Sequence, residues 1–297
     1  MSGLLVVGGS GYLGRSILDR AIAAGIEVHA THARTEPDRT PGVDWHHLDL
    51  RDDAAAVEQL LAALAPAAVV NTAYVQGGED LEAVTASGAE AVAWAAASIG
   101  ARMVHISSDV VFDGRLGRPY EEDDPPTPIT DYGRAKADAE AKVAAAHPGA
   151  ALVRTSLLYG GPPGSGAAIG SHERLVLDVL AGRAQVAFFS DEMRCPAQVD
   201  DVGAAVVGLA LGRPADGVDP VPLAGPVHLV GSERVSRLAF ARAIAAAHGA
   251  DPATLAAATA ADRQPPRPLD LHLVSTRPGV PHLRGVSAVF STDEVGR

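Results

Sequence analysis

Short, uninterrupted apolar runs alternate along this chain with longer segments that carry apolar residues at helical spacing. Apolar runs of four or five residues are typical of parallel strands that are buried on both faces of a sheet. The predicted strands cover residues 4–7, 27–31, 44–48, 67–70, 103–106 and 151–154, with a further short strand at 227–231. The predicted helices cover residues 15–24, 54–64, 173–180, 201–211 and 236–248, and two more contain residues 83–86 and 131–136.

This order of elements predicts a fold class and two domains. Strands that alternate with helices indicate an α/β fold with a doubly wound parallel sheet. The alternation is regular over residues 1–159 and becomes mixed afterwards, so residues 160–297 are expected to form mainly a smaller C-terminal α/β domain. A part of that second half, about residues 185–230, is expected to return to the first domain. The cleft between the two domains is where we expect a ligand.

The first predicted strand runs into a glycine-rich turn, Gly-Gly-Ser-Gly-Tyr-Leu-Gly at residues 8–14. The glycines fit two registers, GxGxxG from Gly9 and GxxGxxG from Gly8, and we favour the second because Val7 is the natural end of the strand. In either register the missing Cβ atoms let the backbone approach a pyrophosphate, and the start of the next helix supplies free N–H groups. The turn therefore predicts a Rossmann-type dinucleotide site, the alternative being a tight turn without a ligand. The candidate contacts are Gly8, Ser10, Gly11, Tyr12 and Leu13.

The end of the second predicted strand bears on which dinucleotide binds. A site for NAD usually places an acidic residue about 20 residues after the glycines, where it holds the ribose hydroxyls. This chain has Thr31 and Arg34 there instead. A guanidinium suits the 2′-phosphate of NADP(H), which is therefore the preferred cofactor. Glu36 keeps NAD(H) as the alternative, and Arg34 could equally be a solvated loop residue.

Two side chains in the segment from residue 131 suggest acid–base chemistry. Tyr132 and Lys136 are four residues apart, so on a helix they share one face. A nearby ammonium group favours a phenolate, so we expect Lys136 to lower the pKa of Tyr132 and make it a better proton donor. The bland alternative is that the pair arises by chance. Ser108, after a buried strand, adds a hydroxyl, although the paired serines there could merely satisfy loose backbone groups.

These motifs together resemble the extended short-chain dehydrogenase/reductases. The run Ser-Ser-Asp-Val-Val-Phe-Asp-Gly at residues 107–114 is similar to that of the dTDP-4-dehydrorhamnose reductase branch, the sugar-nucleotide-binding reductases. The resemblance implies that Ser108 orients a substrate carbonyl, that Tyr132 protonates the forming alkoxide and that Lys136 holds the nicotinamide ribose. Asp109 and Val110 would lie beside the substrate. Dehydratases of this superfamily need a Glu where Val110 stands, which argues against elimination.

Further cofactor contacts are implied by the same resemblance. Asp49 and Leu50 fall where the family holds the adenine, although Asp52 or Asp53 could make this segment a simple helix cap. Residues 71–74, Asn-Thr-Ala-Tyr, resemble the segment that passes beside the nicotinamide ribose. The implied contacts there are Thr72, Ala73 and Tyr74, and Tyr74 is also expected to line the substrate pocket.

Two residues and one segment add to the predictions for the site. Relatives generally carry an Asn where Thr85 stands, which weakens the inference of catalysis. Arg194, two residues before Pro196, falls where relatives have an arginine facing the substrate, the alternative being a pair with a local carboxylate. The glycine-rich segment 160–170 is expected to form a mobile loop over the site.

Composition limits the partners. The 297 residues carry a formal net charge of −12 without a visible Lys/Arg cluster, so nucleic acid and anionic membrane surfaces are not expected partners. The single cysteine, Cys195, fits a reducing compartment. No apolar run reaches the length of a membrane span, and no basic region precedes the first apolar segment. We therefore expect a cytoplasmic protein. The scattered histidines show no spacing typical of metal ligands.

The sequence thus predicts an NADPH-dependent carbonyl reductase whose substrate, by family resemblance, is a nucleotide-linked 4-keto sugar or a similar small ketone. One rival is a non-catalytic nucleotide-binding subunit, like the methionine adenosyltransferase regulatory subunit of the same branch. Another is an epimerase that retains NAD and uses Tyr132 as a base. The oligomeric state stays open, with a homodimer allowed.

Overall fold

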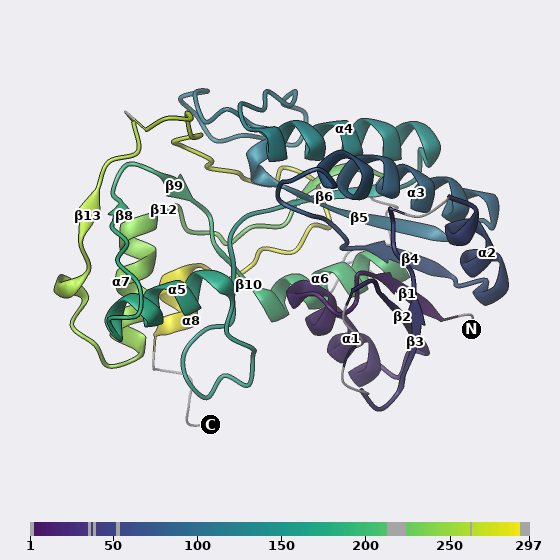
Figure 1. Ribbon diagram of the computed structural model, residues 1–297, viewed down its shortest axis with the longest axis horizontal. Helices are drawn as coiled ribbons and strands as arrows, with labels where there is room; N and C mark the ends of the chain where they lie inside the picture. Colours follow the sequence, from purple (N-terminus) through teal and green to yellow (C-terminus); the bar gives the residue numbers. More distant parts are fainter. Residues whose placement is uncertain are drawn as a thin grey trace.

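The computed structural model describes residues 3–34, 37, 40–51, 54–212, 224–261 and 263–291. Glu36, Asp52 and Asp53 lie outside the described residues. A seven-stranded parallel sheet forms the centre of the larger domain (Figure 1). Across the sheet its strands are β11 (Gly225–His228), β6 (Ala151–Thr155), β5 (Arg102–Ser108), β4 (Ala68–Asn71), β1 (Leu4–Val7), β2 (Val28–His32) and β3 (Val43–His47).

Helices cover both faces of this sheet (Figure 1). One face carries α1 (Tyr12–Ala23) and α6 (Val199–Leu211), and the other carries α2 (Ala54–Leu64), α3 (Gly88–Ser98) and α4 (Asp131–Ala146). Each helix layer buries its own apolar cluster against the sheet. Gly203 lets α6 approach α1 closely, because a Cβ there would lie 2.5 Å from Ser16 Oγ. Residues 199–211 and 225–228, from the second half of the chain, are thus part of the sheet domain.

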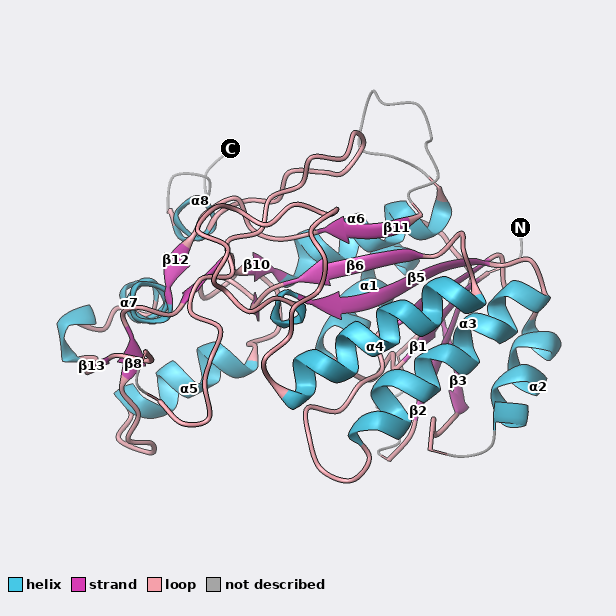
Figure 2. Ribbon diagram, turned by 90° about the horizontal axis from the view of Figure 1, so that it is seen from above, coloured by secondary structure: helices cyan, strands magenta, loops and turns pink. Residues whose placement is uncertain are grey.

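The smaller domain is built from short elements. Its helices are α5 (Ser171–Leu180), α7 (Arg237–Ala247) and α8 (Val286–Phe290), with a 3-10 turn η3 (Pro252–Thr254). Its two-residue strands pair as β7 (Leu158–Tyr159) with β10 (Ala197–Gln198), β8 (Phe188–Phe189) with β13 (Ala257–Ala258), and β9 (Met193–Arg194) with β12 (Val235–Ser236). The carboxyl ends of β5, β6 and β11 point toward this domain (Figure 2).

The predicted fold class, a doubly wound parallel sheet with a smaller C-terminal domain, is confirmed. The long strands and helices lie where the apolar runs and helical spacing predicted them, with ends displaced by a few residues. The short strands of the smaller domain were not predicted, because a pair of residues carries no periodicity. Two short helices also join strands to helices, η1 (Ala83–Ser87), a π-helix, and η2 (Asp109–Val111), a 3-10 turn. None of the described helices combines the length and apolar character needed to cross a membrane.

Candidate active site

The glycine-rich turn joins β1 to α1 in a conformation that depends on its glycines. Gly8 directly follows β1 with φ +80°, and a Cβ on Gly14 would lie 2.6 Å from the Gly8 carbonyl oxygen. These positions agree with the GxxGxxG register. Among the described atoms, a Cβ on Gly11 would meet only the Gly8 carbonyl oxygen, at 3.2 Å, and no side chain caps the start of α1. The turn therefore offers an open glycine surface and an uncapped helix N-terminus, which fits a pyrophosphate.

Two threonines hold this turn in place. Thr31 is buried at the end of β2, and its Oγ1 accepts a hydrogen bond from the Gly8 N–H (3.0 Å). Thr72 donates from the far side to the carbonyls of Val7 (3.0 Å) and Gly8 (3.1 Å). The Thr31 hydroxyl thus shapes the turn, a function that sequence reasoning missed when it assigned Thr31 to the cofactor. Ser10, Tyr12, Leu13 and Ala73 lie around the same turn or at the end of β4, and their contact with a cofactor stays a prediction.

The carboxyl ends of β2 and β3 bring a set of charged side chains together. Arg34 donates from Nη2 to Asp80 Oδ2 at 2.9 Å, and Arg51 donates from Nη1 to the same oxygen at 3.3 Å. Asp49 pairs with Arg51, and this hydrogen bond lowers the pKa of Asp49 to about 2. Leu50 is buried against Gly88 at the start of α3. Neither Arg51 nor Asp80 was predicted as a site residue. Asp80 lies in the loop after β4, far from Arg34 and Arg51 in the sequence.

The predicted acid–base pair lies on the first turns of α4, at the end of β5. Thr130 caps this helix by accepting from the Gly133 N–H (3.0 Å). A Cβ on Gly133 would lie 2.3 Å from the Val110 carbonyl oxygen, so only glycine lets α4 come this close to η2. One turn on, Lys136 Nζ donates to the Ile106 carbonyl at 2.9 Å. The helix is therefore anchored two residues before and two residues after Ser108.

Tyr74 completes this cluster. Its ring centroid lies 5.8 Å from that of Tyr132, and Lys136 Nζ lies 5.0 Å from the Tyr74 centroid and 6.0 Å from that of Tyr132. The Lys136 side chain is 2% exposed, whereas Tyr74 is 48% exposed. The structure thus brings Tyr74, Tyr132 and Lys136 together, with Lys136 beneath the two rings and Tyr74 accessible to a ligand.

Burial dominates the titration of this pair. It lowers the pKa of Lys136 to about 8, against the opposing charge of Glu140. It also raises the pKa of Tyr132 well above its usual value, together with the neighbouring Tyr74 and Asp109. We expected the pKa of Tyr132 to be lowered by Lys136, whereas in this structure it is raised, chiefly by burial. Tyr132 is a neutral phenol at physiological pH, which is the form that can donate a proton.

Ser108 ends β5 beside a buried carboxyl group. Its hydroxyl lies 3.2 Å from Asp109 Oδ1 and accepts weakly from the Val110 N–H at 3.4 Å. Asp109 is also held by the Ser156 hydroxyl, which donates to Oδ2 at 2.6 Å, and burial raises the pKa of Asp109. The capping contact of Ser108 is the bland alternative that the sequence left open. The hydroxyl donates its one proton to Asp109, so it would have to turn away from that carboxyl group to donate to a ligand.

Glu140 links α4 to strands β5 and β6, which the sequence did not predict. It stands four residues after Lys136, a spacing that would allow a pair along the helix. Instead it accepts from Arg154 Nε (3.0 Å) and Nη2 (2.8 Å) on β6 and from the Ser107 hydroxyl (2.6 Å) on β5. Arg154 and Glu140 are both buried. This ion pair ties the helix that carries Tyr132 to the two strands beneath it.

Thr85, the departure from the family pattern, lies buried in the π-helix η1 before α3. Its Oγ1 accepts from the Val75 N–H and donates to the Val75 carbonyl, both at 3.1 Å. A side-chain amide has the same donor and acceptor capacity. Thr85 therefore satisfies both backbone groups of the residue that follows Tyr74.

Arg194 lies at the boundary with the smaller domain and is already engaged. It donates to the Met193 carbonyl (2.7 Å) and the Pro268 carbonyl (3.0 Å), and its Nη2 lies 3.1 Å from Glu192 Oε1. Only 3% of Arg194 is exposed. The structure shows the alternative that the sequence left open, a pair with a local carboxylate. A direct substrate contact would require these partners to be replaced.

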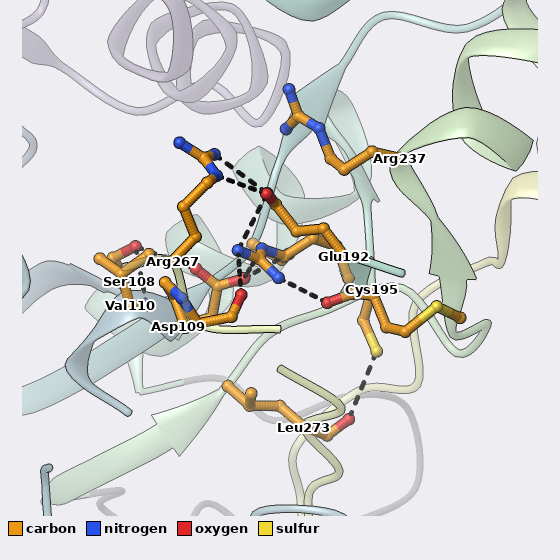
Figure 3. A network of polar contacts seen from close by, with 12 residues as sticks. Ser108, Asp109, Val110, Glu192, Cys195, Arg237, Arg267 and Leu273 are labelled. Carbon is orange, nitrogen blue, oxygen red and sulfur yellow. Dashed lines mark hydrogen bonds and ion pairs between the residues drawn. The ribbon is translucent and has the colours of Figure 1, made fainter. Parts of the chain in front are cut away.

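Two other arginines around Glu192 are better placed for a ligand. Arg267 forms a bidentate pair with Glu192 (2.5 and 3.1 Å) and stays 44% exposed. Arg237 from α7 lies on the other side of Glu192, near enough to Asp109 for their charges to interact (Figure 3). Burial alone would raise the pKa of Glu192, but these guanidinium groups hold it below its usual value. Sequence reasoning missed both, since only folding gathers residues 192, 237 and 267.

The segment 160–170, which we expected to be a mobile loop, is tied at both ends. The buried Glu173 carboxylate accepts from the N–H groups of Gly160 (2.7 Å), Gly161 (3.0 Å) and Gly170 (2.7 Å). From the glycine-rich turn, the Tyr12 hydroxyl donates to the Ala168 carbonyl at 2.8 Å. Tyr12 therefore links the candidate pyrophosphate site to this loop through its side chain. Among the described residues, no group of His, Cys, Asp or Glu side chains is arranged to hold a metal ion.

The chain is similar to known proteins over most of its length. The model of the RmlD substrate binding domain family matches residues 1–277. The dTDP-4-dehydrorhamnose reductase of Mycobacterium tuberculosis is 32% identical over 276 residues, which cover 89% of this chain and 81% of that protein. Rat methionine adenosyltransferase 2 subunit beta is 30% identical over 256 residues, which cover 82% of this chain and 71% of that protein.

Solved structures agree on the fold. The Bacillus anthracis dTDP-4-dehydrorhamnose reductase, crystallised with NADP, superposes with a TM-score of 0.77 over 98% of both chains at 20% identity. The Bordetella bronchiseptica enzyme WbmH, crystallised with NAD+, gives 0.77 over 98% of this chain and 96% of its own at 19% identity. With its Rossmann-type sheet and the match over residues 1–277, the chain belongs to the RmlD substrate binding domain family, within the extended short-chain dehydrogenase/reductases.

Proposed function

We propose that this protein is an NADPH-dependent carbonyl reductase that acts on a nucleotide-linked 4-keto sugar or a similar small ketone. The observation that carries the proposal is the pairing of a neutral, half-buried Tyr132 with a buried Lys136 on a helix anchored on both sides of Ser108. A protein that only binds a nucleotide has no need of a desolvated phenol and ammonium group together.

Each side chain would have one task. When bound, NADPH would supply the hydride to the carbonyl carbon. The Ser108 hydroxyl would donate to the carbonyl oxygen and orient it. The Tyr132 phenol would transfer its proton to the alkoxide that forms, so that carbonyl, hydride and proton together give an alcohol. The Lys136 ammonium, 6.0 Å from the Tyr132 ring centroid, would stabilise the phenolate left behind until solvent returns a proton.

The guanidinium groups near Glu192 support a phosphate-bearing substrate. In a chain of net charge −12, three arginines, Arg194, Arg237 and Arg267, lie around Glu192. Figure 3 shows Arg237 and Arg267 on opposite sides of Glu192, with Ser108 and Asp109 in the same region. Arginine is the residue best suited to bind a diphosphate in several directions at once. Arg267 and Arg237 are our candidates for this contact. The relatives named dTDP-4-dehydrorhamnose reductase support the same substrate class.

The test is NADPH oxidation in the presence of nucleotide-linked keto sugars and simple ketones, with Tyr132→Phe as the decisive variant. We expect turnover to fall by about 10²- to 10⁴-fold, the usual contribution of a general acid. The affinity for NADPH should change little. Tyr159→Phe is the matched control, because the buried Tyr159 hydroxyl has no hydrogen-bond partner among the described residues.

A second candidate function is a nucleotide-binding subunit without turnover. The similarity to methionine adenosyltransferase 2 subunit beta favours it. Tight NADPH binding without oxidation by any carbonyl compound, and with no effect of Tyr132→Phe, would support this second function against the first.

A further inference from the structure

The charged cluster at the carboxyl ends of β2 and β3 contains one carboxylate that two arginines share. Arg34 follows β2 by two residues and Arg51 follows β3 by four, and these parallel strands are neighbours. The glycine-rich turn adjoins the end of β2, because Thr31 accepts from the Gly8 N–H. The two guanidinium groups therefore lie on the side of the turn where the adenosine half of a dinucleotide is expected.

Asp80 lies between these two guanidinium groups. A single oxygen, Oδ2, accepts from Arg34 Nη2 at 2.9 Å and from Arg51 Nη1 at 3.3 Å. One anionic oxygen that receives donors from two arginines is also the arrangement in which a phosphate oxygen is held. Asp80 comes from the segment after β4, which lies on the opposite side of β1 from β2 and β3. The Asp80 carboxylate thus connects the loop after β4 with the two arginines that follow β2 and β3.

The charges of this cluster nearly cancel. Arg51 also pairs with Asp49, so the two described guanidinium groups face two described carboxylates. The Asp49 pair is the more buried, with Asp49 11% exposed, whereas Asp80 is 37% and Arg34 64% exposed. An incoming phosphate would displace the more exposed partner, Asp80, because that group loses least by returning to water.

We propose that Asp80 determines cofactor specificity by competing with the 2′-phosphate of NADP(H) for Arg34 and Arg51. Arg51 is then the second arginine of the 2′-phosphate site. NADH, which lacks this phosphate, leaves the Asp80 pairs intact. This inference rests on the proposed function, since it assumes that the chain binds a nicotinamide dinucleotide.

The experiment is calorimetric measurement of the dissociation constants of NADPH and NADH for the full chain and its variants. Asp80→Asn removes the competing charge, so NADPH should bind about two- to fivefold more tightly, the range for one exposed charge pair, while NADH changes little. Arg34→Gln should weaken NADPH by about ten- to a hundredfold, with NADH again little affected. Both side chains are partly exposed, so both variants should fold.

Glu79→Gln is the matched control, since it removes the same charge from the neighbouring exposed residue. An equal gain in NADPH affinity from Glu79→Gln would reduce the effect to general charge and overturn the inference. An unchanged NADPH-to-NADH ratio in Asp80→Asn would overturn it too, while leaving the proposed reductase intact. Failure of the unmodified chain to bind either cofactor would overturn both.

Discussion

The two ends of the candidate cofactor site hold charge in opposite ways. At the catalytic end, Lys136, Glu140 and Arg154 are almost completely buried, and burial moves the pKa of Lys136 to about 8. At the adenosine end, Arg34 and Arg51 are 64% and 38% exposed. Electrostatic contacts are strong where water is excluded and weak where it is present. The catalytic end should therefore respond sharply to single substitutions and the adenosine end only modestly.

The largest effect should follow removal of Glu140. Glu140→Ala leaves the buried Arg154 guanidinium without its carboxylate and the Ser107 hydroxyl without its acceptor. Loss of one partner of a buried ion pair costs about 3–5 kcal/mol. Denaturant unfolding should show this loss. The exposed pair Arg183–Asp178 is the control, since Asp178→Ala should cost about 1 kcal/mol or less. Equal losses in the free energy of unfolding at both sites would contradict the contrast between buried and exposed ion pairs.

A smaller loss is expected at Thr85. Thr85→Val keeps the shape of the side chain but leaves the Val75 N–H and carbonyl without their partner, at a cost of about 1–3 kcal/mol. Because Val75 follows Tyr74, the KM for the carbonyl substrate should rise as well. Thr85→Ser, which keeps the hydroxyl, should restore both the free energy of unfolding and the KM. If Ser fares no better than Val, the hydrogen bonds are not what Thr85 contributes.

The pH dependence of turnover should report the buried lysine. Lys136 is charged below its pKa of about 8 and neutral above it, so the Tyr132 phenolate loses its stabilising charge as pH rises through about 8. We expect kcat/KM to fall by about tenfold per pH unit above that value. The pKa of Tyr132 is raised, so its own ionisation should not contribute in this range. A flat profile up to about pH 10, the ordinary pKa of a free tyrosine, would contradict a catalytic ammonium group at Lys136.

The smallest effect concerns salt. The contacts of Arg34 and Arg51 are exposed, and exposed charges are screened at a Debye length of about 3 Å in about 1 M salt. The preference for NADPH over NADH should therefore shrink by a few-fold between low salt and about 1 M salt. The pH above which kcat/KM falls, which we assign to the buried Lys136, should change little between low and high salt. A large salt-induced shift of that pH would show that water reaches the catalytic end.

Features that depend on residues near one another in the sequence could be predicted, and contacts between distant segments could not. Apolar runs and helical spacing predicted the sheet and the sharing of one face by Tyr132 and Lys136, because these depend on residues near one another in the chain. The Thr31 hydrogen bond to Gly8, the Glu140 pair with Arg154 and the convergence on Asp80 depend on distant segments. None of these carries a periodic signal.

The error over Tyr132 has a physical source. Spacing predicted correctly that Lys136 would lie near the phenol, but it carries no information on burial. The Tyr74 ring comes from the loop after β4, far from α4 in the sequence, and Tyr74 is one of the groups that raise the pKa of Tyr132. Arg194 illustrates the same point, because its burial at the domain boundary is a property of the folded chain.

The central claim is that this chain transfers hydride to a carbonyl carbon with Tyr132 as the proton donor. The most direct test uses NADPH that carries deuterium at the transferred position, a nucleotide-linked 4-keto sugar and mass spectrometry of the sugar product. The account predicts one deuterium on the new alcohol carbon with the unmodified chain. It also predicts incorporation slower by at least about 10²-fold with Tyr132→Phe, the lower bound for a general acid. Absence of deuterium in any product, although NADPH binds, would contradict the claim.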